Sequence, residues 1–171
     1  MQKWMIFIIV LLIIVLGVIV VMNVDIETEY IPEPEIEEVE MRKTMVSLYF
    51  KNKVSGELEK ETRLIDSKEL LREPYEVLIE MLLEGPENEN YERIIPEEIS
   101  IIGKMYKNGC VTINFSKEFY DNMSDLERNK AIESIFKTLF ELTEVTSIKI
   151  IIDNQEIEGI SNVITKQTYQ Y

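Results

Sequence analysis

The sequence predicts an α+β protein held at a membrane by one N-terminal helix. Three observations predict this: an uncharged apolar run at the start, an acidic stretch with prolines after it, and a remainder in which strand and helix patterns alternate. The chain has 171 residues, of which 32 are acidic and 18 basic, and its net charge is −14. Because phosphate binding needs the opposite sign of charge, nucleic acid is not an expected partner.

The apolar run covers residues 5–22 and contains no charged side chain. As a helix it would extend about 27 Å, close to the thickness of a bilayer's hydrocarbon core. Lys3 precedes the run, whereas only acids follow it before Arg42, so we expect the N-terminus in the cytoplasm and the remainder outside. The exit of the run lacks an A-x-A-like cleavage site, which favours an uncleaved anchor over a signal peptide. Its many Ile and Val residues are poor helix formers in water, which disfavours a buried core helix.

We divide the chain into four segments. Residues 1–22 are the cytoplasmic start and transmembrane anchor, 23–43 an acidic linker, 44–160 one domain and 161–171 a C-terminal tail. The linker combines self-repelling acids with Pro32 and Pro34, so it is expected to be an extended, solvated spacer.

Two absences limit the chemistry. The sequence has no histidine, the commonest general base and metal ligand, and its only cysteine is Cys110. An intramolecular disulfide and a CxxC site are therefore excluded. We expect no catalytic, cofactor-binding or metal-binding residues and no cofactor, and we interpret Cys110 as a packing residue of a strand.

The domain opens with a predicted hairpin. Residues 45–50 alternate apolar and polar side chains, which is typical of a strand with one buried face. Residues 52–56 supply a turn, and the strongly charged segment 58–65 is expected to form an exposed edge strand. A helix should then start near Pro74 and end at Gly85, with an inner stripe at helical spacing formed by Tyr75, Leu78, Ile79 and Leu82.

The second half repeats the alternation. Asn108-Gly109 between two apolar segments predicts a two-residue hairpin of type I′. Ser124 and Glu127 match a capping box, so a long helix should follow. Its predicted apolar stripe is Ile132, Ile135, Phe136, Leu139 and Phe140. Residues 147–152 then form a last, central strand.

The predicted order is hairpin-α-β-β-α-β. A mostly antiparallel sheet with two helices on one face would make a two-layer sandwich. Such a fold serves several unrelated functions, so the fold by itself does not assign one.

These residues occur in the order seen in a known family. The landmarks are the strand Val46–Phe50, the segment Leu82–Pro86, Ile95-Pro96, Asn108-Gly109, Asn114–Ser116 with Phe119, Thr138-Leu139, and the strand Ile148–Ile152 followed by Asp153. Over roughly residues 44–159 the chain resembles the sporulation and spore germination (GerMN) domain. Asn154 stands where the family often has glycine.

The resemblance implies a bacterial envelope protein whose domain mediates assembly rather than catalysis. Relatives sit outside the cytoplasmic membrane of spore formers, and some carry two such domains, a lipid anchor and links to ring-like complexes. This chain resembles a single-domain member with a helical anchor. The implied partners are envelope proteins and copies of the chain itself, together with the membrane.

Three function classes stay open. The first is a non-enzymatic interaction module, with the segments Leu58–Ile65 and Thr168–Tyr171 as candidate surfaces. The second is a module for a cell-wall polymer or small ligand, suggested by Tyr49, Tyr91 and Tyr106, which could stack on sugars. The third is an envelope hydrolase, for which the candidate acids and bases are Glu97, Glu98, Glu118 and Asp121.

Two further motifs are weaker. The run Glu87–Asn90 faintly resembles a calcium loop, but Glu92 occupies the position that needs glycine. Asn114 and Asn122 each begin a glycosylation sequon, which matters only in a secretory pathway that uses it. We interpret both motifs as incidental.

Overall fold

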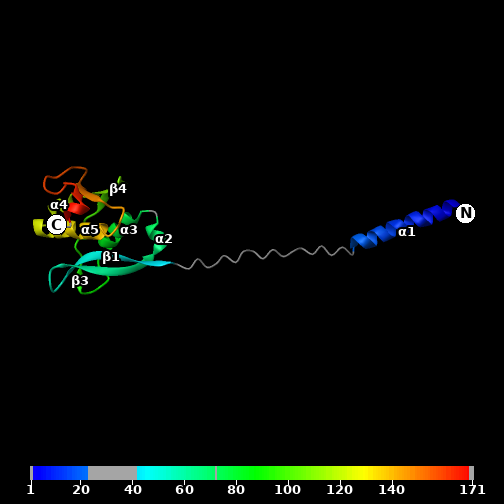
Figure 1. Ribbon diagram of the computed structural model, residues 1–171, viewed down its shortest axis with the longest axis horizontal. Coiled ribbons are helices and arrows are strands. Elements are labelled where there is room, and N and C mark those ends of the chain that lie inside the picture. Colours follow the sequence, from blue (N-terminus) through cyan, green and yellow to red (C-terminus); the bar gives the residue numbers. More distant parts are fainter. Residues whose placement is uncertain (1, 23–41, 72, 170–171) are drawn as a thin grey trace. The chain divides into compact units, whose positions relative to one another are not determined.

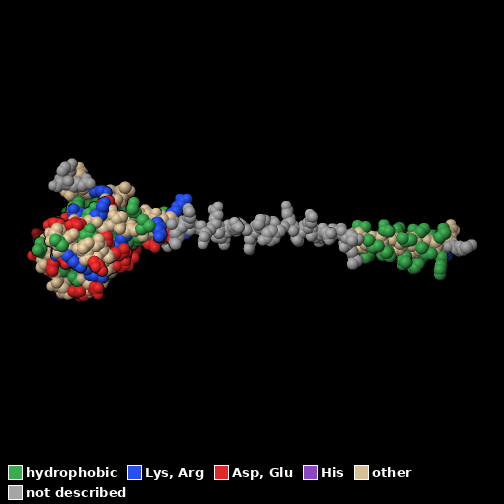
Figure 2. Space-filling view, turned by 90° about the horizontal axis from the view of Figure 1, so that it is seen from below, with side chains coloured by type: hydrophobic (Ala, Val, Ile, Leu, Met, Phe, Trp, Pro, Cys, Tyr) green, Lys and Arg blue, Asp and Glu red, His purple; other side chains and the backbone are tan. Residues whose placement is uncertain are grey.

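The computed structural model describes residues 2–22, 42–71 and 73–169, and it contains two separate units (Figure 1). The first unit holds α1 (Gln2–Met22), a helix of 21 residues that includes the whole predicted span. Hydrophobic side chains cover the face of α1 seen in Figure 2, and by length and composition α1 could cross a membrane; a signal sequence would share both properties. The linker predicted for residues 23–41 lies outside the described residues.

The second unit starts with a three-stranded antiparallel sheet. It consists of β1 (Lys43–Asn52), β2 (Leu58–Asp66) and β3 (Tyr91–Glu92), in the spatial order β2-β1-β3. The alternation predicted for β1 is confirmed, because Val46, Leu48 and Phe50 are all buried. The prediction that the segment after the turn is an edge strand is confirmed as well.

Two helices pack on β1. α3 (Pro74–Glu84) begins at its proline and ends before Gly85, and its four predicted stripe residues are buried. α5 (Asp125–Leu139) begins with the predicted capping box, in which the Ser124 hydroxyl accepts from Glu127 N and the Glu127 carboxylate accepts from Ser124 N. The short helices α2 (Ser67–Leu70) and α4 (Glu118–Asp121) complete the connections.

The second sheet has four strands in the order β4-β5-β6-β7. Their bounds are Ile101–Lys107, Cys110–Phe115, Ser147–Ile152 and Ile164–Thr165, and α6 (Lys166–Tyr169) follows β7. Asn108 and Gly109 have φ values of 51° and 80°, which confirms the type I′ turn between β4 and β5. β6 lies between two strands, as predicted.

The arrangement of the strands corrects one expectation. We expected a single sheet with helices on one face, whereas the domain has two sheets, and in Figure 1 α3 and α5 lie between β1 and β4. β5 and β6 also pair in parallel. The connection through α4 and α5 returns the chain to the same end of the sheet, and such crossovers join parallel strands.

One hydrophobic core connects both sheets with the helices. Phe50, Leu78, Phe115, Phe119, Leu139 and Ile150 are among its fully buried members. The rings of Phe115 and Phe119 stack with centroids 4.3 Å apart, which joins β5 to α4. The segment expected as a C-terminal tail takes part too, because β7 pairs with β6 and Tyr169 packs against Phe136 and Phe140.

Candidate functional site

β2 forms the open side of the first sheet, and its backbone geometry follows from that of β1. Tyr49 N donates to Thr138 Oγ1 and Tyr49 O accepts from Ser134 Oγ, so both groups point away from β2 and toward α5. Tyr49 is opposite Lys60, which makes this pair the non-hydrogen-bonded kind. By alternation, the backbone groups of Lys60, Thr62 and Leu64 point out of the sheet at its edge.

The charges of β2 are not all on the surface, which corrects the expectation for residues 58–65. Glu61 and Arg63 are only 7% and 6% exposed, because they share the face of β2 that meets the core. Their side chains pair at 2.6 Å between Arg63 Nη2 and a Glu61 carboxylate oxygen. Lys60, Thr62 and Leu64 occupy the opposite, exposed face.

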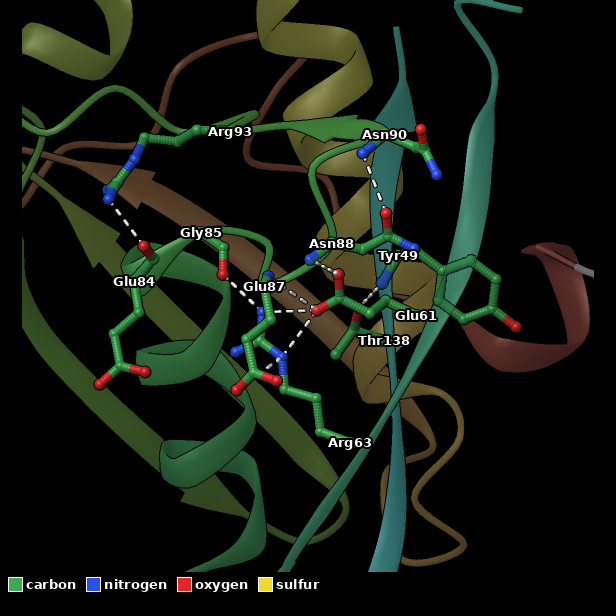
Figure 3. Close-up of polar contacts among 10 residues, drawn as sticks. All are labelled: Tyr49, Glu61, Arg63, Glu84, Gly85, Glu87, Asn88, Asn90, Arg93 and Thr138. Carbon is green, nitrogen blue, oxygen red and sulfur yellow. Dashed lines mark hydrogen bonds and ion pairs between the residues drawn. The ribbon is translucent and has the colours of Figure 1, made fainter.

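The buried pair holds the loop that follows α3 (Figure 3). Arg63 Nη2 donates to the carbonyl oxygen of Gly85 at 2.5 Å, and the Glu61 carboxylate accepts from the amides of Glu87 and Asn88 at 3.2 and 3.0 Å. Both charges therefore have several partners, which a buried ion pair needs in order to be tolerated. The loop is fixed to the inner face of β2 by polar contacts.

The same contacts set the ionisation of Glu61. Burial by itself opposes the charged carboxylate, but hydrogen bonds from Asn88 N, Arg63 and Glu87 N outweigh it, and the pKa of Glu61 is lowered from its ordinary value. Glu61 is consequently an anion under ordinary conditions.

Arg93 extends this support to β3. Its guanidinium donates to the carbonyl oxygens of Leu83 and Glu84, the latter at 2.7 Å, and pairs with Glu97 at 3.2 Å. The last carbonyls of a helix lack partners inside the helix and carry partial negative charge, so an arginine stabilises them. Arg63 and Arg93 together cap the C-terminus of α3.

A groove of about 300 Å³ lies between the segment that follows β3 and the start of α5. One wall contains Arg93, Ile94 and Pro96, and the other contains Met123 and Leu126. Leu126, in the first turn of α5, is 74% exposed at this groove. The nearby lysines are already paired, Lys51 with Glu92 and Lys130 with Glu57.

The three tyrosines proposed as a sugar platform lie on different elements. The Tyr49 hydroxyl donates to Glu141 at 2.8 Å, and its pKa is raised to about 12 by burial and by that carboxylate. Tyr106 stacks on Tyr75 at 5.6 Å, and its hydroxyl donates to a backbone carbonyl. Tyr91 belongs to β3. The fold does not bring these rings together on one strand or helix.

The candidate carboxylates are exposed. Glu97 pairs with Arg93, and Asp121 pairs with Lys117 at 3.0 Å. The pKa of Glu118 is lowered, first by a hydrogen bond from the Ser116 side chain. A general acid in a glycosidase needs a raised pKa, and the pKa of Glu118 is shifted in the opposite direction.

The remaining motifs have structural roles. Cys110 is a half-buried free thiol at the start of β5. Asn114 is buried and exchanges hydrogen bonds with Asn154, so this sequon is inaccessible, whereas Asn122 is exposed. The Asn88 side chain accepts from Asn90 N within its own loop. In the described part of the chain, no three Asp, Glu or Cys side chains gather as metal ligands would.

The C-terminal segment contains a second candidate surface. Tyr169 rests against Phe136 and Phe140, and hollows of about 350 and 400 Å³ flank it. Burial and the charge of Glu133 raise the pKa of Tyr169 to about 12. Residues 170 and 171 lie outside the described residues, so that half of the predicted surface stays a prediction.

Three arginines and one acid organise the domain although the sequence patterns did not predict this role for them. They are Glu61, Arg63 and Arg93, described above, and Arg128. Arg128 is buried on α5 and donates to the carbonyl oxygens of Tyr120 and Met123, both at 2.8 Å, and to the carboxylate of Asp125. The signal for Glu61 and Arg63 was their spacing of two in a strand, which puts opposite charges on one face.

The geometry defines a non-repeating α+β domain with an open sheet edge, and comparison with known proteins gives its family. Residues 47–158 match Germane, the family described as sporulation and spore germination. The chain belongs to this family, in a single copy. A search of curated proteins finds no significant match.

Two solved structures support the fold, and a third is similar in sequence. The first GerMN domain of the sporulation protein GerM from Bacillus subtilis is 19% identical with a TM-score of 0.60, and the alignment covers 72% of this chain and 98% of that domain. The tandem domains of the same protein give 19% and 0.55, with 72% of this chain and 44% of that one covered. A candidate lipoprotein from Clostridium perfringens is 27% identical with a TM-score of 0.49, over 73% of this chain and 89% of that one.

Proposed function

We propose that this chain is a membrane-tethered GerMN domain that acts outside the cytoplasmic membrane as a non-enzymatic interaction module, assembling envelope proteins during sporulation or germination. The observation that carries the proposal is the open nine-residue edge of β2. Such an edge offers backbone donors and acceptors to a partner strand. Family membership supports the cellular setting, and α1 with Lys3 before it supports the tether and its direction.

Site-specific photo-cross-linking in the native membrane tests this role. A photoreactive residue at Leu64, on the exposed face of β2, should capture defined envelope proteins or further copies of the chain. The same group at Val54, which is exposed at the turn of the hairpin, is the matched control. Capture of wall fragments alone, or equal yields at the two positions, would contradict the proposal.

The direction of the tether needs its own test. Protease added to intact protoplasts should degrade the domain and leave a short N-terminal fragment. Full protection of the domain, with degradation only after the membrane is opened, would contradict a location outside the cytoplasmic membrane.

A further inference from the structure

We propose that two copies of this chain pair through β2, antiparallel and about a two-fold axis at Thr62, so that their first sheets join into one. This inference rests on the proposed function, since it names a partner for the same edge. A two-fold interface is formed by the same surface on both copies, so β2 must be complementary to itself.

The backbone of β2 is suited to such pairing. Lys51, like Tyr49, directs its backbone away from β2, because it pairs with Glu92 of β3. Its partner Leu58 therefore points outward, in phase with Lys60, Thr62 and Leu64. In an antiparallel pair, a residue whose backbone N–H and C=O point out of its own sheet must lie opposite another residue of that kind. A two-fold axis at Thr62 meets this condition along the whole strand. Thr62 is also the midpoint of Leu58–Asp66.

The side chains select the same register. With Thr62 facing Thr62, Glu61 faces Arg63 of the second copy, and Lys60 faces Leu64. At the ends Leu58 faces Asp66 and Glu59 faces Ile65, so no like charges are opposed. Moving the centre to Lys60 puts lysine opposite lysine and Glu59 opposite Glu61. Moving it to Leu64 leaves only residues 62–66 paired, because the chain after Asp66 enters α2. Like charges directly opposite each other destabilise the register centred on Lys60, and the register centred on Leu64 loses four of the nine paired residues.

The exposed face of the hairpin gives the pairing apolar contacts. Met45 and Leu64 are adjacent across the strands and are 72% and 59% exposed. In the proposed register Lys60 of the second copy lies beside Leu64, where its aliphatic stem covers apolar surface while its ammonium stays in water. A partner strand removes such exposed apolar side chains from water, which stabilises the paired state.

The tether is compatible with two copies on one membrane. In the antiparallel arrangement the two β1 strands begin at opposite ends of the joined sheet, about 30 Å apart at the rise of a strand. A chain with the 19 residues of the segment 23–41 has a maximum reach of about 60 Å. Both anchors therefore reach the same bilayer, and shared tethering raises the effective concentration of one copy near another.

Disulfide trapping in membranes, with the full-length chain, tests the register. In a Cys110→Ser background, Thr62→Cys places two cysteines opposite each other at about 5.5 Å between Cα atoms, within disulfide range. Lys60→Cys is the matched control, because its counterpart in the second copy is displaced by about 13 Å along the strand. We expect on the order of tenfold more disulfide dimer for Thr62→Cys than for Lys60→Cys. Mixing Lys60→Cys with Leu64→Cys chains should restore cross-linking, only between unlike chains.

A second measurement does not depend on disulfide chemistry. Thr62→Pro removes an outward amide that makes no bond within the sheet, so the domain should keep its circular dichroism spectrum. The mass of the detergent-solubilised protein by light scattering should fall from dimer to monomer. A monomeric parent protein, or equal trapping at Thr62 and Lys60, overturns the pairing. If envelope proteins are still captured at Leu64, that result leaves the proposed function intact; if nothing is captured, both fail.

Discussion

The amide of Tyr49 donates to Thr138 Oγ1 across 3.1 Å, although 89 residues separate the two. Together with Ser134, whose hydroxyl donates to Tyr49 O, Thr138 lets a helix take the place of a neighbouring strand beside β1. Beside Tyr49 the first sheet therefore ends at α5, β3 pairs with β1 only at Lys51 and Asn52, and the open edge lies at β2. At this point of β1 the helix satisfies backbone groups that a neighbouring strand of a single sheet would otherwise bind.

Thr138→Val keeps the shape of the side chain and removes the acceptor for Tyr49 N. Leaving a buried amide without a partner should lower the free energy of unfolding by about 1–3 kcal/mol. Amide hydrogen exchange at Tyr49 should become faster. Thr143→Val, at an exposed position, is the control and should change stability by less than about 0.5 kcal/mol. Unchanged hydrogen exchange at Tyr49 would show that Thr138 does not protect the Tyr49 amide.

Arg63→Met should be among the most damaging single substitutions in the domain. It leaves the Glu61 carboxylate buried without its main cation, which should cost about 3–5 kcal/mol. Adding Glu61→Leu should recover part of this loss, because the uncompensated charge is removed. Unfolding should be followed by far-ultraviolet circular dichroism, since the single tryptophan, Trp4, lies in α1 and does not report on the domain. Additive losses would argue that the two charges are not coupled.

Glu61 should also make stability depend on pH. Its pKa is lower in the folded state, so its contribution is present above the ordinary value of about 4.3 and is lost as the pH falls through the folded pKa. Glu61→Gln should thus flatten the decline of stability below about pH 4.3. Glu158→Gln, on an exposed loop, is the control and should leave the slope unchanged. A parallel slope in both variants would assign the acid sensitivity to other groups.

Gly109→Ala should lower the stability of the β4–β5 hairpin by more than the backbone strain of an alanine at positive φ accounts for. A Cβ at this position, where φ is +80°, would lie 2.5 Å from Thr146 Oγ1. Gly56 also has a positive φ, +72°, but a Cβ there meets nothing within 4 Å, so Gly56→Ala measures the backbone term by itself. We expect Gly109→Ala to be worse than Gly56→Ala by more than about 1 kcal/mol in chemical unfolding. Equal losses would indicate that the strands shift to make room.

Two tyrosines should ionise late in an alkaline titration. The pKa values of Tyr49 and Tyr169 are raised to about 12, so their contribution to stability is complete below about pH 10 and is lost between there and about pH 12. Tyr49→Phe and Tyr169→Phe should each remove one late phenolate from the ultraviolet absorbance titration. Because the pKa of Tyr75 is raised as well, only the single substitutions assign the groups. Unchanged late absorbance in both would contradict the assignment.

Much of the domain follows from local sequence. The bounds of α3 come from Pro74 and Gly85, the start of α5 from Ser124 and Glu127, and the second hairpin from Asn108-Gly109. Each signal acts within one or two turns of chain, where propensity and hydrogen bonding are decided by neighbours. The apolar composition of residues 5–22 likewise determines the long helix α1.

Tertiary structure decided what those signals could not. Whether β5 and β6 pair in parallel depends on the crossover through α5, and the backbone of Tyr49 finds its partners in hydroxyls of α5 that lie more than 80 residues away. Charge suggested that all of β2 faces water, yet Glu61 and Arg63 are buried because the loop after α3 supplies their partners. A charged side chain is buried only where distant groups compensate it, and the sequence around it does not contain them.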